Sequence, residues 1–390
     1  MRRTLIPLFT VIFLLNNLTL SRTIPAAQSG TLPVVEPESG SVVCPPGVYN
    51  NATDGCLPLG PSEYLGQIAA SGIPYPILPM QGYQPPAELN DIPYQYFKVT
   101  EKGAPLFASV EDALNNQPST QIAPGYELFV SYVGVQTDQN GTSYYQLRSG
   151  YLIGMDGARQ AVPVFQGRAF SSQPTRPFGW VMDVTIPRTA PGLTSPESSH
   201  KFYRYNIVQI YDTKEASNLT WNLVGPNEWV DSREVARVDP HTTPPKGVTG
   251  SRWIEVNLFE QTLSVYDNNR LVFATLVSSG VNPFWTRPGI FHIYIKKPTE
   301  TMSGATEADR SDYYYLEDVP WTMYFDEERA LHGEYWHSML GYTMSHGCVN
   351  LSVGDSHWLY NWANVGDTVY VYDPSGKTPE DPALYGAGAP

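Results

Sequence analysis

The sequence predicts a mainly β fold, and three features of its composition point to that class. Aromatic residues make up 13% of the 390 residues, with 26 Tyr among them, and aromatic side chains favour strands. The chain also contains 35 Pro and 32 Gly, which build turns and loops. Only 16% of the residues are charged, whereas long helices are rich in residues such as Glu and Lys. We therefore expect short strands in about two to four domains.

The formal net charge is −14, which argues against binding to polyanions. Nucleic-acid binding proteins carry basic stripes or patches, and docking on anionic lipid needs clustered Lys and Arg. We expect no nucleic-acid partner.

Residues 1–28 have the order of a secretory signal. Arg2 and Arg3 precede an apolar run over residues 5–20, and the small residues Ala26 and Ala27 follow. An uncleaved membrane anchor is the alternative, although the run is short for a span. Export is expected in either case.

Three cysteines divide into a pair and a single residue. Residues 29–43 form a Pro/Glu/Ser linker, and residues 44–90 are expected to form a small module closed by a Cys44–Cys56 disulfide. Two unpaired thiols are the alternative. Within this module, residues 61–65 predict a short helix with Ser62 as its cap. Cys348 is then left over, and an odd cysteine in an exported chain suggests a reactive thiol.

Residues 91–240 contain a weak internal duplication, over 126–153 and over 206–230. Each copy reads as a strand, a turn, an aromatic strand, a second turn and a short aromatic strand, and Asn140-Gly141 is a strong hairpin turn. The pattern resembles small β-barrels of the bacterial Src-homology-3 type, so we expect one or two barrel-like modules in tandem. A generic β-module that acts as a spacer is the alternative.

A new domain is expected over residues 251–373, after a Pro-containing linker at 241–250 and before a tail at 374–390. Apolar and polar residues alternate from Ile254, which is the strand period. Further strands are predicted at 263–267, 271–277, 291–297, 321–325 and 369–372, with a helix at 355–363. Residues 298–312 have no periodic pattern, and we interpret them as a lid or an insertion.

The strongest chemical signal is Ser345-His346-Gly347-Cys348-Val349-Asn350, preceded by His332-Gly333. A cysteine nucleophile needs a base, because a free thiol ionises only near pH 8.5. His332 and His346 are the two candidate bases. Gly347 allows a tight turn, and the nearby backbone amides are candidate oxyanion donors.

Two other interpretations of this cluster are available. Cysteine is usually a small buried apolar residue, but this one lies in a polar turn. His332, His346 and Cys348 have side chains that bind zinc, but the paired spacing of a zinc site is missing. We assign no role to the other five histidines, which are His200, His241, His292, His337 and His357. Of these, we expect His337 and His357 at the surface.

This motif resembles the L,D-transpeptidase catalytic domain family, in which a histidine precedes Ser/Thr-His-Gly-Cys. The strand opening at Trp253, the turn Arg287-Pro288-Gly289-Ile290-Phe291 and the closing Gly366-Asp367-Thr368-Val369-Tyr370-Val371 are also similar to that family. The resemblance covers about 120 residues and implies a β-sandwich catalytic domain. The spacer between His332 and Ser345 is short for the family, and Asn350 replaces the Arg of many members.

The resemblance also implies a reaction and a role for each residue. Cys348 attacks a peptidoglycan stem tetrapeptide, and an amine of a second stem resolves the acyl-enzyme into a 3→3 cross-link. His332 is then the base and the Gly333 carbonyl orients it. His346, Ser345 and Gly347 shape the site, and Asn350 supports the loop or contacts substrate. Trp336 and Tyr324 are candidate pocket residues.

The expected partners are peptidoglycan stem peptides and carbapenem-type inhibitors, with no obligate protein partner, no cofactor and no metal. The expected location is the bacterial cell envelope. Two alternatives remain open: the same site using water or a protein amine as acceptor, and a non-catalytic protein that binds the cell wall.

Overall fold

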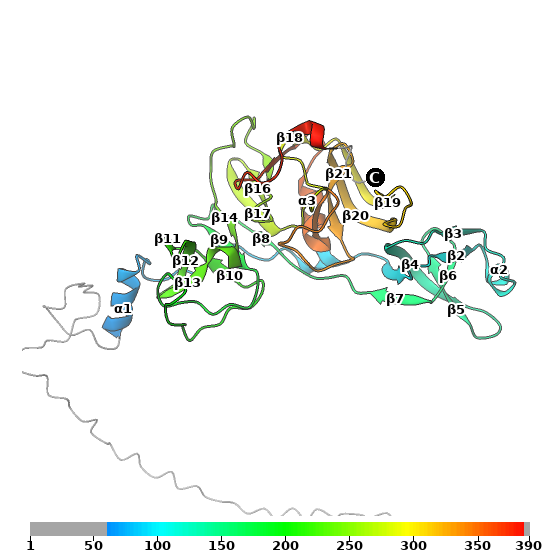
Figure 1. Ribbon diagram of the computed structural model, residues 1–390, viewed down its shortest axis with the longest axis horizontal. Helices are drawn as coiled ribbons and strands as arrows, with labels where there is room; N and C mark the ends of the chain where they lie inside the picture. The colour runs from blue at the N-terminus through cyan, green and yellow to red at the C-terminus, as the bar shows by residue number, and fades with distance from the viewer. Residues whose placement is uncertain (1–60, 386–390) are drawn as a thin grey trace, which may run out of the picture.

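The computed structural model describes residues 61–385. The expected signal segment, the 29–43 linker and the Cys44–Cys56 pair lie outside the described residues. Within them, strands far outnumber helices, which confirms the mainly β class. Residues 251–373, which the sequence predicts to be the catalytic region, lie in the centre, with one β-unit on each side (Figure 1).

The first sheet of the catalytic region has six strands in the order β18-β23-β15-β16-β17-β8. They are β8 (Arg168–Ala169), β15 (Trp253–Asn257), β16 (Thr262–Asp267), β17 (Arg270–Leu276), β18 (Gly289–His292) and β23 (Thr368–Tyr372). The β16–β17 hairpin turns at Asn268 and Asn269, which have φ of 52° and 59°, the left-handed pair that tight hairpins need.

The second sheet carries the motif residues on its strands and their connecting loops. Its catalytic part consists of β19 (Ile295–Gly304), β20 (Tyr314–Asp326), β21 (Arg329–Glu334) and β22 (Val349–Ser352). Helix α3 (Val353–Trp362) follows β22 directly and is capped by Ser352, whose Oγ accepts from the Asp355 nitrogen. The two sheets and α3 enclose one apolar core that includes Val265, Phe273, Leu331, Val349 and Leu359. This is the expected sandwich.

The expectation for residues 298–312 was partly wrong, because 298–304 belong to strand β19. Every residue of β19 is half-buried or exposed, so no apolar alternation marked it in the sequence. Pairing with β20 along its length, from Ile295 opposite Tyr324 to Gly304 opposite Tyr314, determines its conformation instead.

One flanking unit spans residues 95–160 and joins the catalytic sheet. Its elements are β1 (Gln95–Val99), β2 (Ala104–Phe107), α2 (Val110–Leu114), β3 (Thr120–Ile122), β4 (Glu127–Thr137), β5 (Ser143–Leu147), β6 (Leu152–Gly154) and β7 (Gly157–Gln160). Strand β4 pairs in parallel with β20, at Tyr314 opposite Glu127. The strands follow an open path from β7 to β3, whose end strands do not pair with each other in the described part of the chain. Because β4 pairs with β20, the unit is continuous with the catalytic sheet.

The other flanking unit spans residues 178–238 and contains two small sheets. One is formed by β9 (Phe178–Val181), β10 (Ile207–Gln209) and β14 (Val235–Val238). The other is formed by β11 (Asp212–Ala216), β12 (Leu219–Gly225) and β13 (Glu228–Asp231), followed by the short helix η2 (Ser232–Glu234). The first copy of the duplication keeps β4, β5 and β6 in one meander, whereas the second places its first strand and its hairpin in different sheets.

Residues 61–90 pack on two different units. Helix α1 (Pro61–Ala70) places Ile68 in a cluster with Trp221 and Trp229, and the short helix η1 (Ala87–Asn90) lies on α3. Because α1 starts at Pro61, Ser62 lies inside the helix and is not its cap. A ten-residue helix cannot bury its apolar side alone, which explains this packing.

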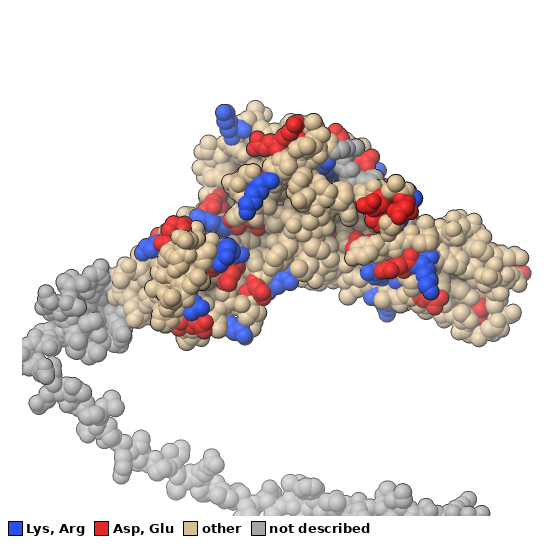
Figure 2. All heavy atoms as spheres, viewed as in Figure 1, with Lys and Arg blue, Asp and Glu red and all other residues tan. Residues whose placement is uncertain are grey.

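The surface is acidic overall but mixed locally. Figure 2 shows small groups of acidic and basic side chains separated by wide uncharged areas. A last short helix, η3 (Pro382–Leu384), lies in the tail. Within residues 61–385, we find no helix with the length and hydropathy needed to cross a bilayer.

Candidate active site

The register of two parallel strands brings Cys348 and His332 to one face of the sheet. Leu331 pairs with Val349 and His332 with Asn350, and Cys348 immediately precedes β22. Because side chains alternate along a strand, Leu331 and Val349 enter the core, while His332 and Cys348 face the opposite side. Diagonal neighbours on one face lie about 7–8 Å apart between Cα atoms.

The main chain of β21 and the turn before it contact the sulfur of Cys348. The Ala330 N–H donates to Sγ at 3.4 Å, and the thiol donates to the Glu328 carbonyl at 3.8 Å. Cys348 is 8% exposed, and burial raises the pKa of its thiol to about 11, although the Ala330 N–H and the Arg329 charge act in the opposite direction. The resting nucleophile is therefore a neutral thiol, not the thiolate that reactivity alone would suggest.

His332 is oriented by the carbonyl of the next residue. Its Nδ1 lies 3.1 Å from the Gly333 oxygen, an arrangement in which Nδ1 carries the proton and Nε2 is a free base. The side chain is buried, and burial lowers the pKa of His332 to about 4. The imidazole is thus neutral at pH 7 with Nε2 unprotonated, although burial also makes it a weaker base than a histidine in water. The ring of Trp336 lies 5.7 Å from that of His332.

The loop before Cys348 is fixed by the segment after β17. The Met344 and Ser345 nitrogens both donate to the Ser279 carbonyl, and Thr286 Oγ1 donates to the Gly347 carbonyl at 2.8 Å. Gly347 has φ of +125°, which favours glycine. Its N–H donates to Ser345 Oγ at 3.2 Å, so this candidate oxyanion donor already has an acceptor at rest.

His346 lies in an aromatic slot. Its ring is 4.9 Å from Phe284 and is parallel to Tyr314 at 5.9 Å. Burial raises the pKa values of Tyr314 and Tyr324 far above the usual range. Both tyrosines lie on strand β20. Tyr324 was a candidate from the sequence, and Tyr314 was missed.

Asn350 belongs to a buried polar cluster that the sequence analysis missed. Its Nδ2 lies 3.3 Å from His337 Nε2, and His337 Nδ1 lies 3.0 Å from Glu334. His337 was expected at the surface, but its side chain is 14% exposed, because Glu334 and Asn350 meet it from two adjacent strands. Burial raises the pKa of Glu334 and lowers that of His337 to about 4. The signal was present: Glu334 lies two residues after His332, on the same face of β21.

A second missed group provides positive charge beside the nucleophile. The Asp326 carboxylate pairs with both Arg329, at 3.1 Å, and Arg287. The Arg329 charge lowers the pKa of the Cys348 thiol and so favours negative charge on sulfur or on an oxyanion, whereas the Glu328 charge acts in the opposite direction.

His357 also differs from expectation, because it is half-buried. Its ring stacks on Trp321 at 3.9 Å, and its Nδ1 lies 3.1 Å from the Leu89 carbonyl. It holds η1 against α3 and lies outside the cluster around Cys348.

Taken together, the site contains a thiol, a neutral imidazole fixed in the tautomer of a base, and nearby positive charge. These are the groups that acyl transfer through a thioester requires.

Residues 251–371 match the family described as YkuD, the L,D-transpeptidase catalytic domain. The chain is 30% identical over 174 residues to L,D-transpeptidase 1 of Mycobacterium tuberculosis, covering 38% of this chain and 67% of that protein.

Two solved structures also show similarity. The L,D-transpeptidase of Stackebrandtia nassauensis is 29% identical over 34% of this chain and 60% of its own, with a TM-score of 0.26. The ertapenem-acylated catalytic domain of the E. faecium L,D-transpeptidase is 25% identical over 32% of this chain and all of its own, with a TM-score of 0.28. The chain thus spans less than two thirds of the first of these structures. The family assignment rests on the sequence matches and not on these superpositions.

Proposed function

The chain belongs to the L,D-transpeptidase family, and from that premise we propose that it is an exported acyltransferase that forms 3→3 cross-links in peptidoglycan through a Cys348 thioester. The observation that carries this proposal is the shared face of Cys348 and His332, with Nδ1 of His332 directed to the Gly333 carbonyl.

Acylation begins with rotation of the thiol from the Glu328 carbonyl toward His332. Sγ attacks the carbonyl carbon of the donor peptide bond while Nε2 of His332 takes the thiol proton. The tetrahedral oxyanion forms in the field of Arg329 and beside the Cys348 loop. When the C–N bond breaks, the imidazolium returns the proton to the leaving amine, and D-alanine departs.

Transfer reverses this order. The amine of a second stem attacks the thioester carbonyl, His332 accepts a proton from that amine, and the sulfur leaves and is reprotonated. Water or a protein amine in place of the stem amine would make the enzyme a carboxypeptidase or an anchoring enzyme. The nature of the acceptor depends on the shape of the pocket.

The resting state explains why a thiol of high pKa can still react. A neutral thiol and a neutral imidazole need no ion pair in a dry site, and proton transfer can accompany attack. The Arg329 guanidinium then stabilises negative charge only as it forms.

The test uses the full-length protein and a Cys348→Ser variant as its matched control. Each is incubated with purified disaccharide-tetrapeptide, and both protein and products are analysed by mass spectrometry. An acyl-enzyme and a 3→3 linked dimer in the wild type alone support the proposal. Hydrolysed tripeptide without dimer would identify water as the acceptor. No adduct on folded wild-type protein, with either the peptide or a carbapenem, would favour the non-catalytic alternative.

A further inference from the structure

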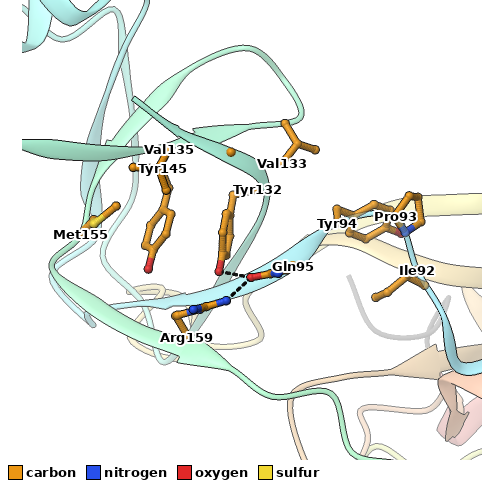
Figure 3. Close-up of a pocket in the computed structure, with 11 residues that line it drawn as sticks. Ile92, Pro93, Tyr94, Gln95, Tyr132, Val133, Val135, Tyr145, Met155 and Arg159 are labelled. Carbon is orange, nitrogen blue, oxygen red and sulfur yellow. Dashed lines mark hydrogen bonds between the residues drawn. The ribbon is translucent and has the colours of Figure 1, made fainter. Parts of the chain in front are cut away.

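A hollow of about 550 Å³ opens on the flanking unit of residues 95–160, outside the site around Cys348 (Figure 3). We propose that it binds a short peptide bearing a free carboxylate, namely a second stem peptide of the cell-wall polymer. This inference rests on the proposed function and adds a subsite to it.

The centre of the hollow is polar and carries an available positive charge. The Tyr132 hydroxyl donates to Gln95 Oε1 at 2.5 Å, and the Arg159 guanidinium donates to the same oxygen (Figure 3). Among residues 61–385, no carboxylate lies within ion-pair distance of Arg159, whereas nearby Arg148 pairs with Asp318 at 2.6 Å. In a chain of net charge −14, an arginine without a carboxylate in a concave site favours an anionic ligand.

The walls of the hollow are apolar and open to solvent. Val133 and Val135 of β4 are 57% and 54% exposed, and Met155 is 37% exposed. Outward-facing strand positions are usually polar, so the two exposed valines of β4, together with Met155 between β6 and β7, indicate a contact surface. Small alkyl side chains such as that of alanine match these walls.

The buried aromatic rings favour a peptide over a glycan. Tyr94, Tyr132 and Tyr145 are 7%, 5% and 8% exposed, and the guanidinium of Arg148 covers the Tyr94 ring at 4.6 Å. A sugar usually stacks on an open aromatic face. Here the Tyr94 hydroxyl donates to the Asp318 carbonyl, and Tyr132 and Tyr145 turn their hydroxyl ends toward Arg159 (Figure 3).

A series of ring contacts connects the hollow to the catalytic base. Tyr94 meets Tyr96 edge-on at 5.5 Å, and Tyr96 stacks on Tyr335 at 3.3 Å. Tyr335 lies 5.0 Å from Trp336, which lies beside His332. Because the β4–β20 pairing also joins the two regions, a stem held in the hollow stays at a fixed separation from Cys348, which raises its local concentration there.

The test uses the full-length protein and a synthetic stem tetrapeptide with free carboxylates and a diazirine group. After irradiation, mass spectrometry locates the label. The expected result is label on residues 92–95, 133–135 or 155, in addition to any label near Cys348. Arg159→Gln should reduce the label in the hollow by about tenfold or more, since it removes a charged hydrogen bond. Arg270→Gln, which removes an exposed arginine from β17, should leave it unchanged.

A second variant and two further probes give independent results. Val135→Glu should also abolish labelling of the hollow, and the same peptide with amidated carboxylates should label it weakly. Label confined to the Cys348 region would overturn the inference, as would equal labelling by the amidated peptide. Displacement of the label by an N-acetylglucosamine oligomer at lower concentration than by unlabelled peptide would overturn the peptide assignment. Acylation of Cys348, measured on the same samples, reports the proposed function separately.

Discussion

The backbone nitrogen of Ala330 lies 3.4 Å from the Sγ of Cys348, so the strand that carries the base also holds the nucleophile. His332 is two residues further along the same strand. Any shift of β21 relative to β22 would therefore disturb both groups together.

Alkylation of Cys348 should be slow at neutral pH. Burial raises the pKa of the thiol to about 11, so about one molecule in ten thousand carries a thiolate at pH 7. The rate with iodoacetamide should increase about tenfold per pH unit until it levels off near the thiol pKa. Mass spectrometry of timed samples measures this rate. A plateau below pH 8 would indicate a resting thiolate and contradict the neutral pair.

Acylation by substrate should have a different pH dependence. The reaction needs neutral His332, whose pKa burial lowers to about 4. The rate should therefore be nearly constant from about pH 5 to 8 and fall only as His332 becomes protonated below that range. Stopped-flow measurement with a carbapenem tests this. A midpoint near 6.5 would show that His332 is not desolvated in the working enzyme.

The two candidate bases should respond unequally to substitution. His332→Ala should lower the acylation rate by about three orders of magnitude or more, and Cys348→Ala should abolish turnover without unfolding the protein. His346→Ala should have a smaller effect, because its ring packs between Phe284 and Tyr314. If His346→Ala is the more damaging of the two histidine variants, the base has been assigned to the wrong residue.

Gly347→Ala should impair the site with little effect elsewhere. Its φ is +125°, and a Cβ would lie 3.3 Å from Arg329 Nε. Strain of about 1–3 kcal/mol should displace the loop and slow acylation by about tenfold or more. Gly366→Ala is a matched control, since Gly366 has φ of +98° and open space around its Cα. Gly366→Ala should lower the free energy of unfolding by a similar amount and leave the acylation rate unchanged.

Asp355 should be important for stability. Its carboxylate accepts from the Gly167 nitrogen at 3.0 Å and from Thr275 Oγ1 at 2.5 Å, which ties α3 to the segment before β8 and to β17. Asp355→Ala leaves these buried donors without an acceptor and should lower the free energy of unfolding by about 2–4 kcal/mol. Urea denaturation measures this free energy of unfolding. Asn361→Ala, at an exposed position of α3, should change it by less than about 0.5 kcal/mol.

Local sequence signals predicted the elements that local interactions determine. The β15–β17 hairpins follow from period-two alternation and from the Asn268-Asn269 turn, and α3 was expected within two residues of its observed start. The strand β19 and the burial of His337 depend on partners distant in the sequence. For His337 the distant partner is Asn350, thirteen residues away, whereas Glu334, three residues away, was the one local sign of the cluster.

The pairing of Glu127 with Tyr314 also has a practical consequence for anyone who shortens this protein. A fragment that starts at residue 251 would keep the complete family match but would lose β4. The outer edge of β20 at residues 314–316 would then have unpaired N–H and C=O groups facing water, and such an edge recruits strands from other molecules. Tyr314, which stacks on His346, lies at that edge, so an isolated catalytic fragment would aggregate through the region that borders its own active site.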